Sequence, residues 1–439
     1  MAIEPMVSKQ QLLKLLFVAV LSTPIPAHAG LQDLFGFGAR GPALSGSAVA
    51  FARGFESVYY NPAGLTVGKG QSFTLGFQAG AFDLKIHSPR AAELASQEKI
   101  DPVSGLNLGF DVRLPLKGAL KDRIALGVGF YIPTKVLFSA QIPAPYTPQL
   151  WVAGSNARSV SFQAGLGVRA TDWLRLGLGV RVMAGLDGRI DVAPGELGNL
   201  GSKVEDEMVT VYGTVAGLMI QPSTHWSIGL VWRDEIGAPY NIPIRADLGE
   251  QLKLPVPPLL IGGKANFDPM QAAIHVGWRL TNDLRVECGV LWKNWSQFPL
   301  PINNATAAIP KQDAPNFSDT FVSRVGIEAD FKLTENTKMV IRSGYAFEPT
   351  PVPTQSGNHN FLDGHRHILS LGNGWAFNMG ADALLDLNLY AQLHIMEKRT
   401  TRKAEVPSDI SVSTNNLGFP WIGSEGMLFS AGLAMGVSF

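Results

Sequence analysis

The chain ends on the stretch Met427-Leu428-Phe429-Ser430-Ala431-Gly432-Leu433-Ala434-Met435-Gly436-Val437-Ser438-Phe439. Successive side chains of a β-strand point to opposite faces, so odd-numbered positions share one face here and even-numbered positions the other. The odd-numbered face is apolar throughout, whereas the other carries mostly Gly, Ala and Ser. A strand with one wholly apolar face and an aromatic last residue is typical of a transmembrane β-barrel, whose outer wall contacts lipid.

Three earlier segments repeat this alternation, with charged residues on the second face. Leu and Val at positions 174 to 182 alternate with Arg and Gly, and residues 274–280 and 321–331 show the same pattern. An arginine facing lipid would cost about 2–4 kcal/mol at the bilayer midplane. We therefore expect Arg175, Arg181, Arg279 and Arg324 to face the lumen of the barrel.

Short and long connections alternate along the chain. Tight polar turns are expected near 118–122, 171–173, 222–225, 281–283, 334–336 and 378–382. Long connections are expected near 88–103, 140–156, 193–205, 237–269, 298–318, 349–363 and 399–425. Outer-membrane barrels have short periplasmic turns and longer external loops. The pattern therefore predicts an all-β, antiparallel transmembrane barrel of about fourteen strands.

The composition agrees with a membrane wall. Only 16% of the residues are charged, whereas a soluble domain carries about 25%. The 36 basic and 36 acidic residues balance, so there is no electrostatic footprint for nucleic acid. Cys288 is the one cysteine, which allows no internal disulfide and fits a small apolar wall residue.

Residues 1–29 resemble an export signal. Lys9 and Lys14 supply positive charge before a short apolar stretch, Leu15 to Ser22. Ala27-His28-Ala29 is a small-residue cleavage pattern. The apolar stretch is shorter than the roughly 20 residues that span a bilayer. We expect the mature chain to begin at Gly30 and to reside in the outer membrane of a Gram-negative bacterium.

Residues 30–69 do not fit the wall, because they are rich in Gly and Ala and lack alternation. The string Gly36-Phe37-Gly38-Ala39-Arg40-Gly41 matches a dinucleotide-binding fingerprint, but no strand precedes it and no βαβ unit follows. A compact segment before the first strand is better interpreted as a plug in the lumen, since barrels of this size otherwise leave an open channel. Residues 70–439 then form the barrel.

Several motifs resemble the FadL family (OmpP1/FadL/TodX), outer-membrane transporters of long-chain fatty acids and hydrocarbons. They are Asn61-Pro62-Ala63-Gly64-Leu65, Trp295-Ser296-Gln297-Phe298, Arg342 to Phe347 with Pro351-Val352-Pro353, and Asp363-Gly364-His365-Arg366. His365 replaces an Asp of the family's pattern. The resemblance implies an N-terminal hatch and uptake by passive diffusion, with capture on external loops and lateral exit through a gap in the wall.

The resemblance also implies where these steps occur. Asn61, Pro62 and Ala63 match the hatch motif, whose movement gates passage. Pro133 follows Gly129 in the third expected strand, where a proline should break pairing, and this matches the family's wall opening. Apolar residues of the expected external loops are candidates for ligand capture, since exposed apolar surface needs a purpose. They are Leu252, Leu254, Val256, Leu259, Leu260 and Trp151.

The ligand's head group is left open. Family members that carry fatty acids place a base just before a conserved Asp, but Ser318 precedes Asp319 here. Four arginines expected to face inward are candidates to replace this base. The alternative is that they simply pair with lumen acids such as Glu328. The four arginines are Arg181, Arg189, Arg324 and Arg342. The missing base leaves room for uncharged ligands.

No enzyme, cofactor or metal is expected. His359, Asp363, His365 and His367 lie close in sequence but lack a metal-ligand spacing, and no catalytic triad or carboxylate pair converges. Expected partners are a hydrophobic small molecule, outer-membrane lipid and lipopolysaccharide, and the protein is expected to be monomeric. A structural or adhesive barrel is the main alternative, and a general porin is disfavoured by the plug and the apolar loops.

Overall fold

A computed structural model describes residues 31–68, 70–90, 102–134, 148–150, 160–194, 200–246, 259–299, 303–304, 314–357, 359–380, 383–404 and 418–439. The expected signal peptide and the capture residues Trp151, Leu252, Leu254 and Val256 lie outside these ranges. The strands of the barrel wall are β1 Gln71–His87, β2 Val103–Arg113, β3 Ile124–Pro133, β5 Ser161–Arg169, β6 Leu174–Pro194, β7 Leu200–Ile220, β8 Trp226–Arg233, β11 Gln271–Arg279, β12 Leu284–Lys293, β14 Thr320–Lys332, β15 Thr337–Glu348, β17 Arg366–Asn378, β18 Leu384–Arg402 and β19 Trp421–Ser438.

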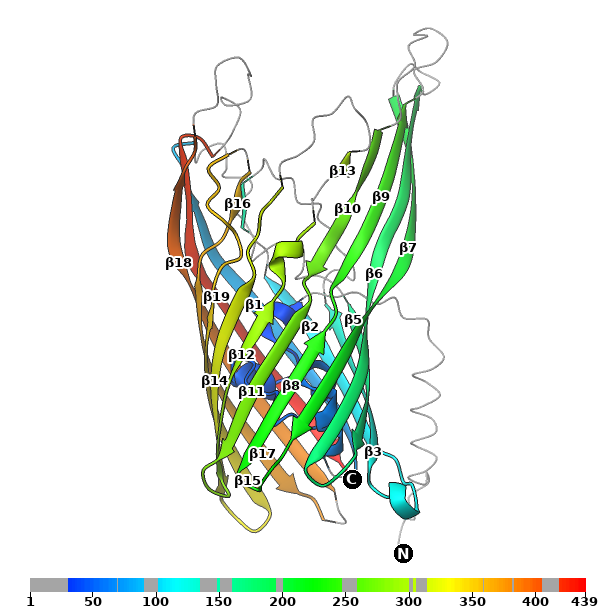
Figure 1. The fold of residues 1–439 in the computed structure, drawn as a ribbon, viewed down its shortest axis with the longest axis vertical. Helices are drawn as coiled ribbons and strands as arrows, with labels where there is room; N and C mark the ends of the chain where they lie inside the picture. Colours follow the sequence, from blue (N-terminus) through cyan, green and yellow to red (C-terminus); the bar gives the residue numbers. More distant parts are fainter. Residues whose placement is uncertain are drawn as a thin grey trace, which may run out of the picture.

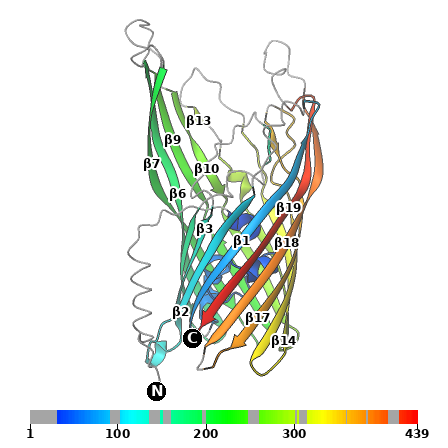
Figure 2. The ribbon, with the colours of Figure 1, turned by 180° about the vertical axis from the view of Figure 1, so that it is seen from behind.

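These fourteen strands close into a cylinder, which confirms the predicted fold class (Figures 1 and 2). Each wall strand pairs with its neighbour in antiparallel register, and β19 returns to pair with β1. The two chain segments at this seam exchange backbone hydrogen bonds, because Gln71 N donates to Phe439 O at 3.1 Å and Phe439 N donates to Gln71 O at 2.9 Å. The C-terminal aromatic residue therefore completes the closure.

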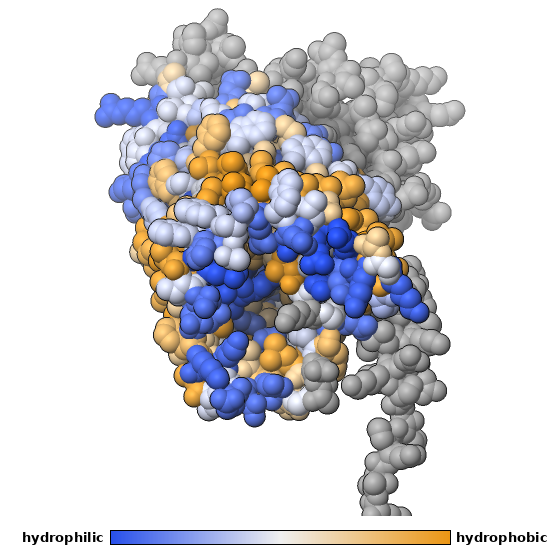
Figure 3. All heavy atoms as spheres, turned by 60° about the horizontal axis from the view of Figure 1, so that its bottom comes forward, coloured by the Kyte–Doolittle hydropathy of each residue, from blue (hydrophilic) through white to orange (hydrophobic). Residues whose placement is uncertain are grey.

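The outward faces are apolar, as the alternation predicted. In β19, Met427, Phe429, Leu433 and Met435 are exposed while Leu428 and Ser430 are buried. Cys288 also lies on the outer face. Figure 3 shows hydrophobic residues on the flank and hydrophilic residues gathered toward the end with the short turns. Near that end Trp226 and Trp278 stack with ring centroids 5.3 Å apart, as expected for an aromatic belt at a membrane interface.

Two of the predicted long connections are wrong in extent. β6 continues to Pro194 and β7 begins at Leu200, so only five residues separate the two strands. Within 237–269 the chain forms a further hairpin of β9 Ile236–Ala246 and β10 Leu259–Asp268. The hairpin departs from the wall beyond Asp234, whose backbone N–H donates to Thr214 O of β7. Residues 244–246 of β9 pair in parallel with Ile190 to Val192 of β6. The prolines of β9, Pro239 and Pro243, are tolerated because the described pairs between β9 and β6 begin only at Ile244, so each proline has one edge without a described strand partner.

Short elements complete the described chain. They are helices α2 Leu31–Phe35, α3 Arg40–Ala43 and α4 Ser57–Tyr60, the 3-10 turns η1 Pro62–Thr66, η2 Gly118–Leu120 and η6 Trp295–Gln297, and strands β4 Gln149–Leu150, β13 Asn303–Asn304 and β16 Phe361–Leu362. No helix in these ranges is long and apolar enough to cross a membrane. Residues 31–68, here called the hatch, lie inside the cylinder (Figure 1).

Candidate functional site

Glycines on the inner wall make room for the hatch. A Cβ added at Gly127 would overlap the Leu65 side chain, and one at Gly129 would overlap the Phe37 ring. A Cβ at Gly177 would overlap the backbone where Pro62 joins Ala63. The hatch therefore fits directly against the bare backbone of β3 and β6.

Asn61 fastens the hatch to the wall. Its side chain is fully buried, and Nδ2 donates to Val49 O and Leu218 O at 3.1 Å each. Its Oδ1 accepts from Ala63 N at 3.2 Å, while Pro62 begins η1. The expected gating residues Asn61, Pro62 and Ala63 thus lie against β6 and β7.

This contact pattern predicts a measurable effect of adding one methyl group to the wall. Gly177→Ala should lower the free energy of unfolding by about 1–3 kcal/mol, because the hatch backbone must move to admit the new Cβ. Gly213→Ala is the matched control, since its Cβ would meet Ile236 at an ordinary distance of 3.4 Å. Chemical denaturation of both variants in detergent checks the prediction, and equal stabilities would contradict the tight seating of the hatch at Gly177.

A buried carboxylate on the wall binds two arginines of the hatch. Glu328 of β14 contacts Arg40 and Arg53 of the hatch, and Arg285 and Arg342 of the wall, at 3.0, 3.0, 3.0 and 2.7 Å. Burial and the neighbouring arginines lower the pKa of Arg53 to about 10, while Glu328 opposes that shift. One carboxylate therefore bridges four arginines and holds hatch and wall together.

A second carboxylate holds the hatch through its backbone. Glu287 of β12 accepts from the N–H groups of Val49, Ala50 and Phe51 at 2.7, 2.9 and 3.0 Å. His275 lies 2.8 Å from the same carboxylate. Because three successive hatch amides share one acceptor, this segment is fixed to β12 in the observed position.

A third group of charges joins the start of the hatch to the wall. Lys293 of β12 donates to Asp33 at 2.9 Å and to Glu348 at 2.8 Å, and Arg366 pairs with Glu348 at 2.8 Å. Burial would raise the pKa of Asp33, but Lys293 holds it well below its usual range. Ion pairs therefore follow the strands from β12 to β17.

The four head-group candidates differ in their surroundings. Arg342 is bound to Glu328, and Arg181 lies 3.6 Å from Asp268 and donates to Asp234 O at 2.7 Å. Arg324 lies beside Gly46 O at 3.4 Å, and within the described ranges no carboxylate pairs with it. The side chain of Arg189 lies outside the described part. Arg324 is thus the candidate best able to meet a ligand.

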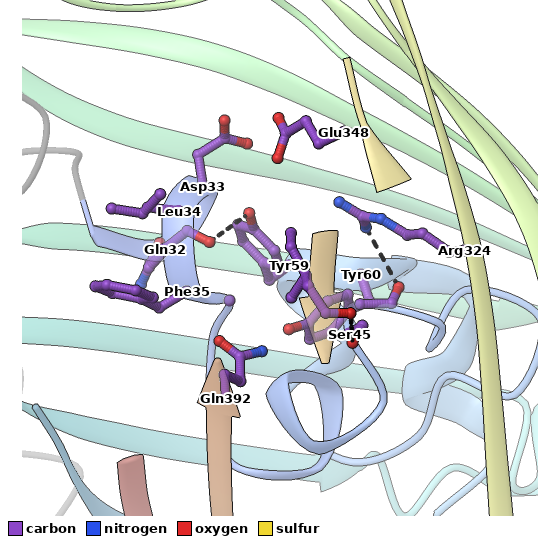
Figure 4. A pocket seen from close by; sticks show the side chains of 13 residues that line it. Gln32, Asp33, Leu34, Phe35, Ser45, Tyr59, Tyr60, Arg324, Glu348 and Gln392 are labelled. Carbon is purple, nitrogen blue, oxygen red and sulfur yellow. Dashed lines mark hydrogen bonds between the residues drawn. The ribbon is translucent and has the colours of Figure 1, made fainter. Parts of the chain in front are cut away.

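Arg324 lines a cavity of about 30 Å³ between hatch and wall, with Asp33, Phe35, Tyr59 and Glu348 among its other lining residues. Figure 4 shows these side chains converging from the hatch and from the wall. Such a volume holds a few water molecules rather than a lipid chain. As it stands, this cavity is too small for the expected ligand.

An apolar cluster occupies the lumen above the hatch, toward the end with the long connections. We call it the upper lumen cluster. It consists of Phe35, Leu84, Ile86, Val103, Tyr131, Leu150, Leu362, Met396, Ile422 and Leu428, all buried. Phe35 comes from the hatch and the others from the wall strands and from β4 and β16. A barrel lumen is ordinarily polar, so enclosed apolar surface of this kind suits an apolar ligand.

Pro133 ends β3 without breaking its pairing to β2, contrary to expectation. Pro133 lies opposite Gly105, and Thr134 N donates to Ser104 O at 3.0 Å. Since successive N–H groups alternate in direction, the proline nitrogen faces away from β2. On that other side the β3–β5 ladder ends at Tyr131 and Ser161. Any opening would therefore lie between β3 and β5.

The hatch motif lies near Gly129 of the expected opening but far from Pro133. Leu65 of the hatch contacts Gly127 of β3, and Pro133 lies six residues further along that strand. At about 3.3 Å per residue this is roughly 20 Å. The hatch residues that do face β3 near Gly129 are Phe37 and Val58, which the sequence interpretation did not identify.

The remaining candidates are placed as follows. Leu259 and Leu260 lie in β10, paired with Ile244 and Pro243, and nothing is described of their side chains. Asp319 accepts from Trp292 Nε1 at 3.1 Å and from Ser296 N at 2.9 Å, so it orders the segment around η6.

The histidines near residue 363 contact different partners. Asp363 binds Thr350, and His367 lies between Tyr345 and Glu397. Across the described ranges no group of three or more His, Cys, Asp or Glu side chains is arranged to hold a metal ion.

A closed antiparallel barrel with an apolar outer wall and a segment folded inside its lumen is the architecture of an outer-membrane protein. Residues 18–419 match the family "Outer membrane protein transport protein (OMPP1/FadL/TodX)", and the chain belongs to this family. Members are outer-membrane transporters of hydrophobic compounds, which are transport channels and not enzymes.

Individual relatives are distant. The long-chain fatty acid transport protein of Escherichia coli (strain K12) is 24% identical over 188 residues, which are 40% of this chain and 41% of that protein. The match thus spans less than half the length of such relatives. Among solved structures, a Pseudomonas aeruginosa FadL homologue is 14% identical with a TM-score of 0.57, covering 92% of this chain and 97% of that one. The P. putida toluene transporter TodX is 15% identical with a TM-score of 0.54, covering 93% and 99%. At these identities the structures share the fold.

Proposed function

We propose that this protein is an uptake channel for hydrophobic compounds, long-chain fatty acids or related hydrocarbons, which cross by passive diffusion. The observation that carries the proposal is the upper lumen cluster, an apolar interior above a seated hatch. The names of the E. coli and P. putida relatives, a fatty acid transporter and a toluene transporter, support the same substrate range.

The proposed path has three stages. Apolar residues of the external connections capture the ligand, and the upper lumen cluster holds it. The ligand then leaves sideways between β3 and β5 near Pro133, beyond the last pair of their ladder, because Gly129 is paired on both sides. Lateral exit is favourable because an apolar molecule gains nothing by entering aqueous periplasm. Movement of the hatch around Asn61, Pro62 and Ala63 opens the way to the exit.

We also propose a division of the chain into three parts. Residues 1–29 are a cleaved export signal, residues 30–69 are the hatch, and residues 70–439 are the barrel. The protein works as a monomer surrounded by outer-membrane lipid and lipopolysaccharide.

Saturable binding tests the proposal directly. Purified protein in detergent should bind labelled oleate or labelled toluene saturably, and unlabelled compound should displace the label. A barrel that shows no saturable binding of either compound would favour the structural or adhesive alternative. Large steady ion currents in a planar bilayer would favour a general porin.

The lateral exit predicts an effect of Pro133→Val. Valine restores a backbone donor on the side facing β5, so it should extend strand pairing and reduce uptake of the labelled compound while leaving stability intact. Pro115→Val is the control, because Pro115 lies exposed in the connection between β2 and β3. Unchanged uptake by the Pro133 variant would argue against an exit at this place.

A further inference from the structure

The inner wall is divided into a charged side and a neutral side. On β19, β1, β2, β3 and β5 the described inward-facing side chains are uncharged except Asp111, Arg113 and Arg169 near the end with the short turns. On β12, β14, β15 and β17 the inward charges extend along the wall. These charges are Arg285, Glu287, Lys293, Arg324, Glu328, Arg342, Glu348 and Arg366. β3, where the proposed exit lies, belongs to the neutral side.

Two tyrosines lie across glycines on this neutral side. Gln78 of β1 pairs with Gly432 on one neighbour and with Gly105 on the other. The Tyr390 ring covers Gly432, and the Tyr131 ring covers Gly105, since an added Cβ at either glycine would overlap the ring. The two tyrosine rings therefore border a patch of the inner wall formed by Gly105, Gly432 and the amide side chain of Gln78, which we call the floor.

Buried polar atoms on the neighbouring strands β2, β3 and β5 lack hydrogen-bond partners within the described residues. They are Tyr131 Oη, Asn107 Oδ1, Ser161 Oγ and Gln163 Oε1. Their residues are 0%, 2%, 3% and 1% exposed. Leaving buried hydrogen-bonding groups unpaired is costly, and native proteins seldom do so. These groups are all uncharged, and together they offer hydroxyl donors and amide acceptors.

The same groups adjoin the upper lumen cluster. Tyr131 belongs to that cluster, and Phe35 of the hatch covers Gly80, two residues beyond Gln78 on β1. Tyr131 and Ser161 also form the last pair of the β3–β5 ladder. A ligand whose apolar body lies in the cluster would bring one end to these hydroxyls at the proposed exit.

We propose that Tyr131, Asn107 and Ser161 form a subsite for an uncharged hydrogen-bonding group, such as a hydroxyl or carbonyl, at one end of a hydrophobic ligand. The preferred ligands are then neutral amphiphiles, including alcohols, ketones, esters and phenols, in preference to carboxylates. A carboxylate bound by Tyr131, Asn107 and Ser161 would lose its hydration without a cation beside it. The described inward-facing basic residues of β2, β3 and β5 are Arg113 and Arg169, which lie near the end with the short turns. This inference rests on the proposed function and narrows its substrate class.

Three probes with the same chain test the subsite. Dodecanol has a neutral hydrogen-bonding end, dodecane has none, and dodecanoate is charged. Their dissociation constants are measured by equilibrium binding to the purified full-length protein, and to its Tyr131→Phe variant, which keeps the ring and loses only the hydroxyl. Tyr212→Phe, on the lipid-facing surface, is the matched control. Ser161→Ala is a second variant that removes the other hydroxyl.

Dodecanol should bind the wild-type protein most tightly of the three. Tyr131→Phe should weaken dodecanol binding about three- to tenfold, the range expected for one hydrogen bond, and leave dodecane binding unchanged. Ser161→Ala should act in the same direction. Saturable dodecane binding without selective weakening of dodecanol in either variant, or tightest binding of dodecanoate, would overturn the subsite alone. Failure of all three probes to bind would refute the proposed function as well.

Discussion

Replacing Glu328 with Gln should cost about 3–5 kcal/mol of stability, because removing one partner of a buried ionic group leaves the others uncompensated. Glu328 pairs with Arg40 and Arg53 of the hatch and with Arg285 and Arg342 of the wall. The amide keeps the size of the side chain and loses its charge. Mutual repulsion of the arginines should then also loosen the hatch, which would appear as greater ion conductance.

Glu335→Gln is the control for this prediction. Glu335 forms a solvent-exposed pair with Lys332 at 3.2 Å, and exposed pairs contribute little to stability. Both variants are compared by urea denaturation in detergent and by planar-bilayer conductance. If the Glu328 variant matches the wild-type protein in both measurements, the carboxylate does not hold the hatch in place.

Leu178→Arg should destabilise the barrel by about 2–4 kcal/mol, the expected cost of arginine facing the middle of the bilayer. Leu178 of β6 is 61% exposed and points away from the lumen. Trp173, an exposed aromatic residue of the kind enriched at membrane interfaces, lies five residues earlier. At about 3.3 Å per residue and a tilt of roughly 40°, Leu178 lies about 13 Å from the level of Trp173, near the middle of an apolar band about 25 Å tall.

The comparison for Leu178→Arg is Leu178→Met, which keeps an apolar side chain in lipid. Unfolding by denaturant in lipid vesicles should separate the two variants clearly. An arginine variant as stable as the methionine variant would mean that this face of β6 does not contact lipid.

The wall could be predicted from the sequence because one physical cause acts at every second residue. Lipid contact requires Met427, Phe429 and Leu433 to be apolar, and the lumen accepts Ser430 and Gly432. Leu428 departs from this pattern, since it is a large apolar residue on the inward face. Such exceptions near the ends of β1, β18 and β19 were the available signal for the upper lumen cluster.

Contacts of the hatch could not be predicted from local patterns. The alternation places Glu287 and Glu328 on the inner face, but their hatch partners lie 238 and 288 residues away in the sequence. Nothing in the spacing of either carboxylate indicates a backbone amide or an arginine partner. The glycines that receive the hatch are similarly ambiguous, because small residues on an inner wall fit open lumen equally well.

The expected loops were wrong where strands run beyond the membrane. Residues 236–246 contain Pro239 and Pro243, which argue against a strand in a closed wall. That argument applies only where both edges are paired within the cylinder. Above the cylinder, β9 pairs with β10 along most of its length, whereas its described pairs with β6 begin only at Ile244. Pro239 and Pro243 therefore each have one edge without a described strand partner.

Uptake of labelled oleate and labelled toluene by Gram-negative cells that produce or lack this protein tests the central claim most directly. An apolar interior above a seated hatch predicts faster entry of at least one of these compounds when the protein is present, with no comparable gain for a polar sugar of similar mass. Equal entry of both compounds with and without the protein would contradict a role in hydrophobic uptake for these ligands.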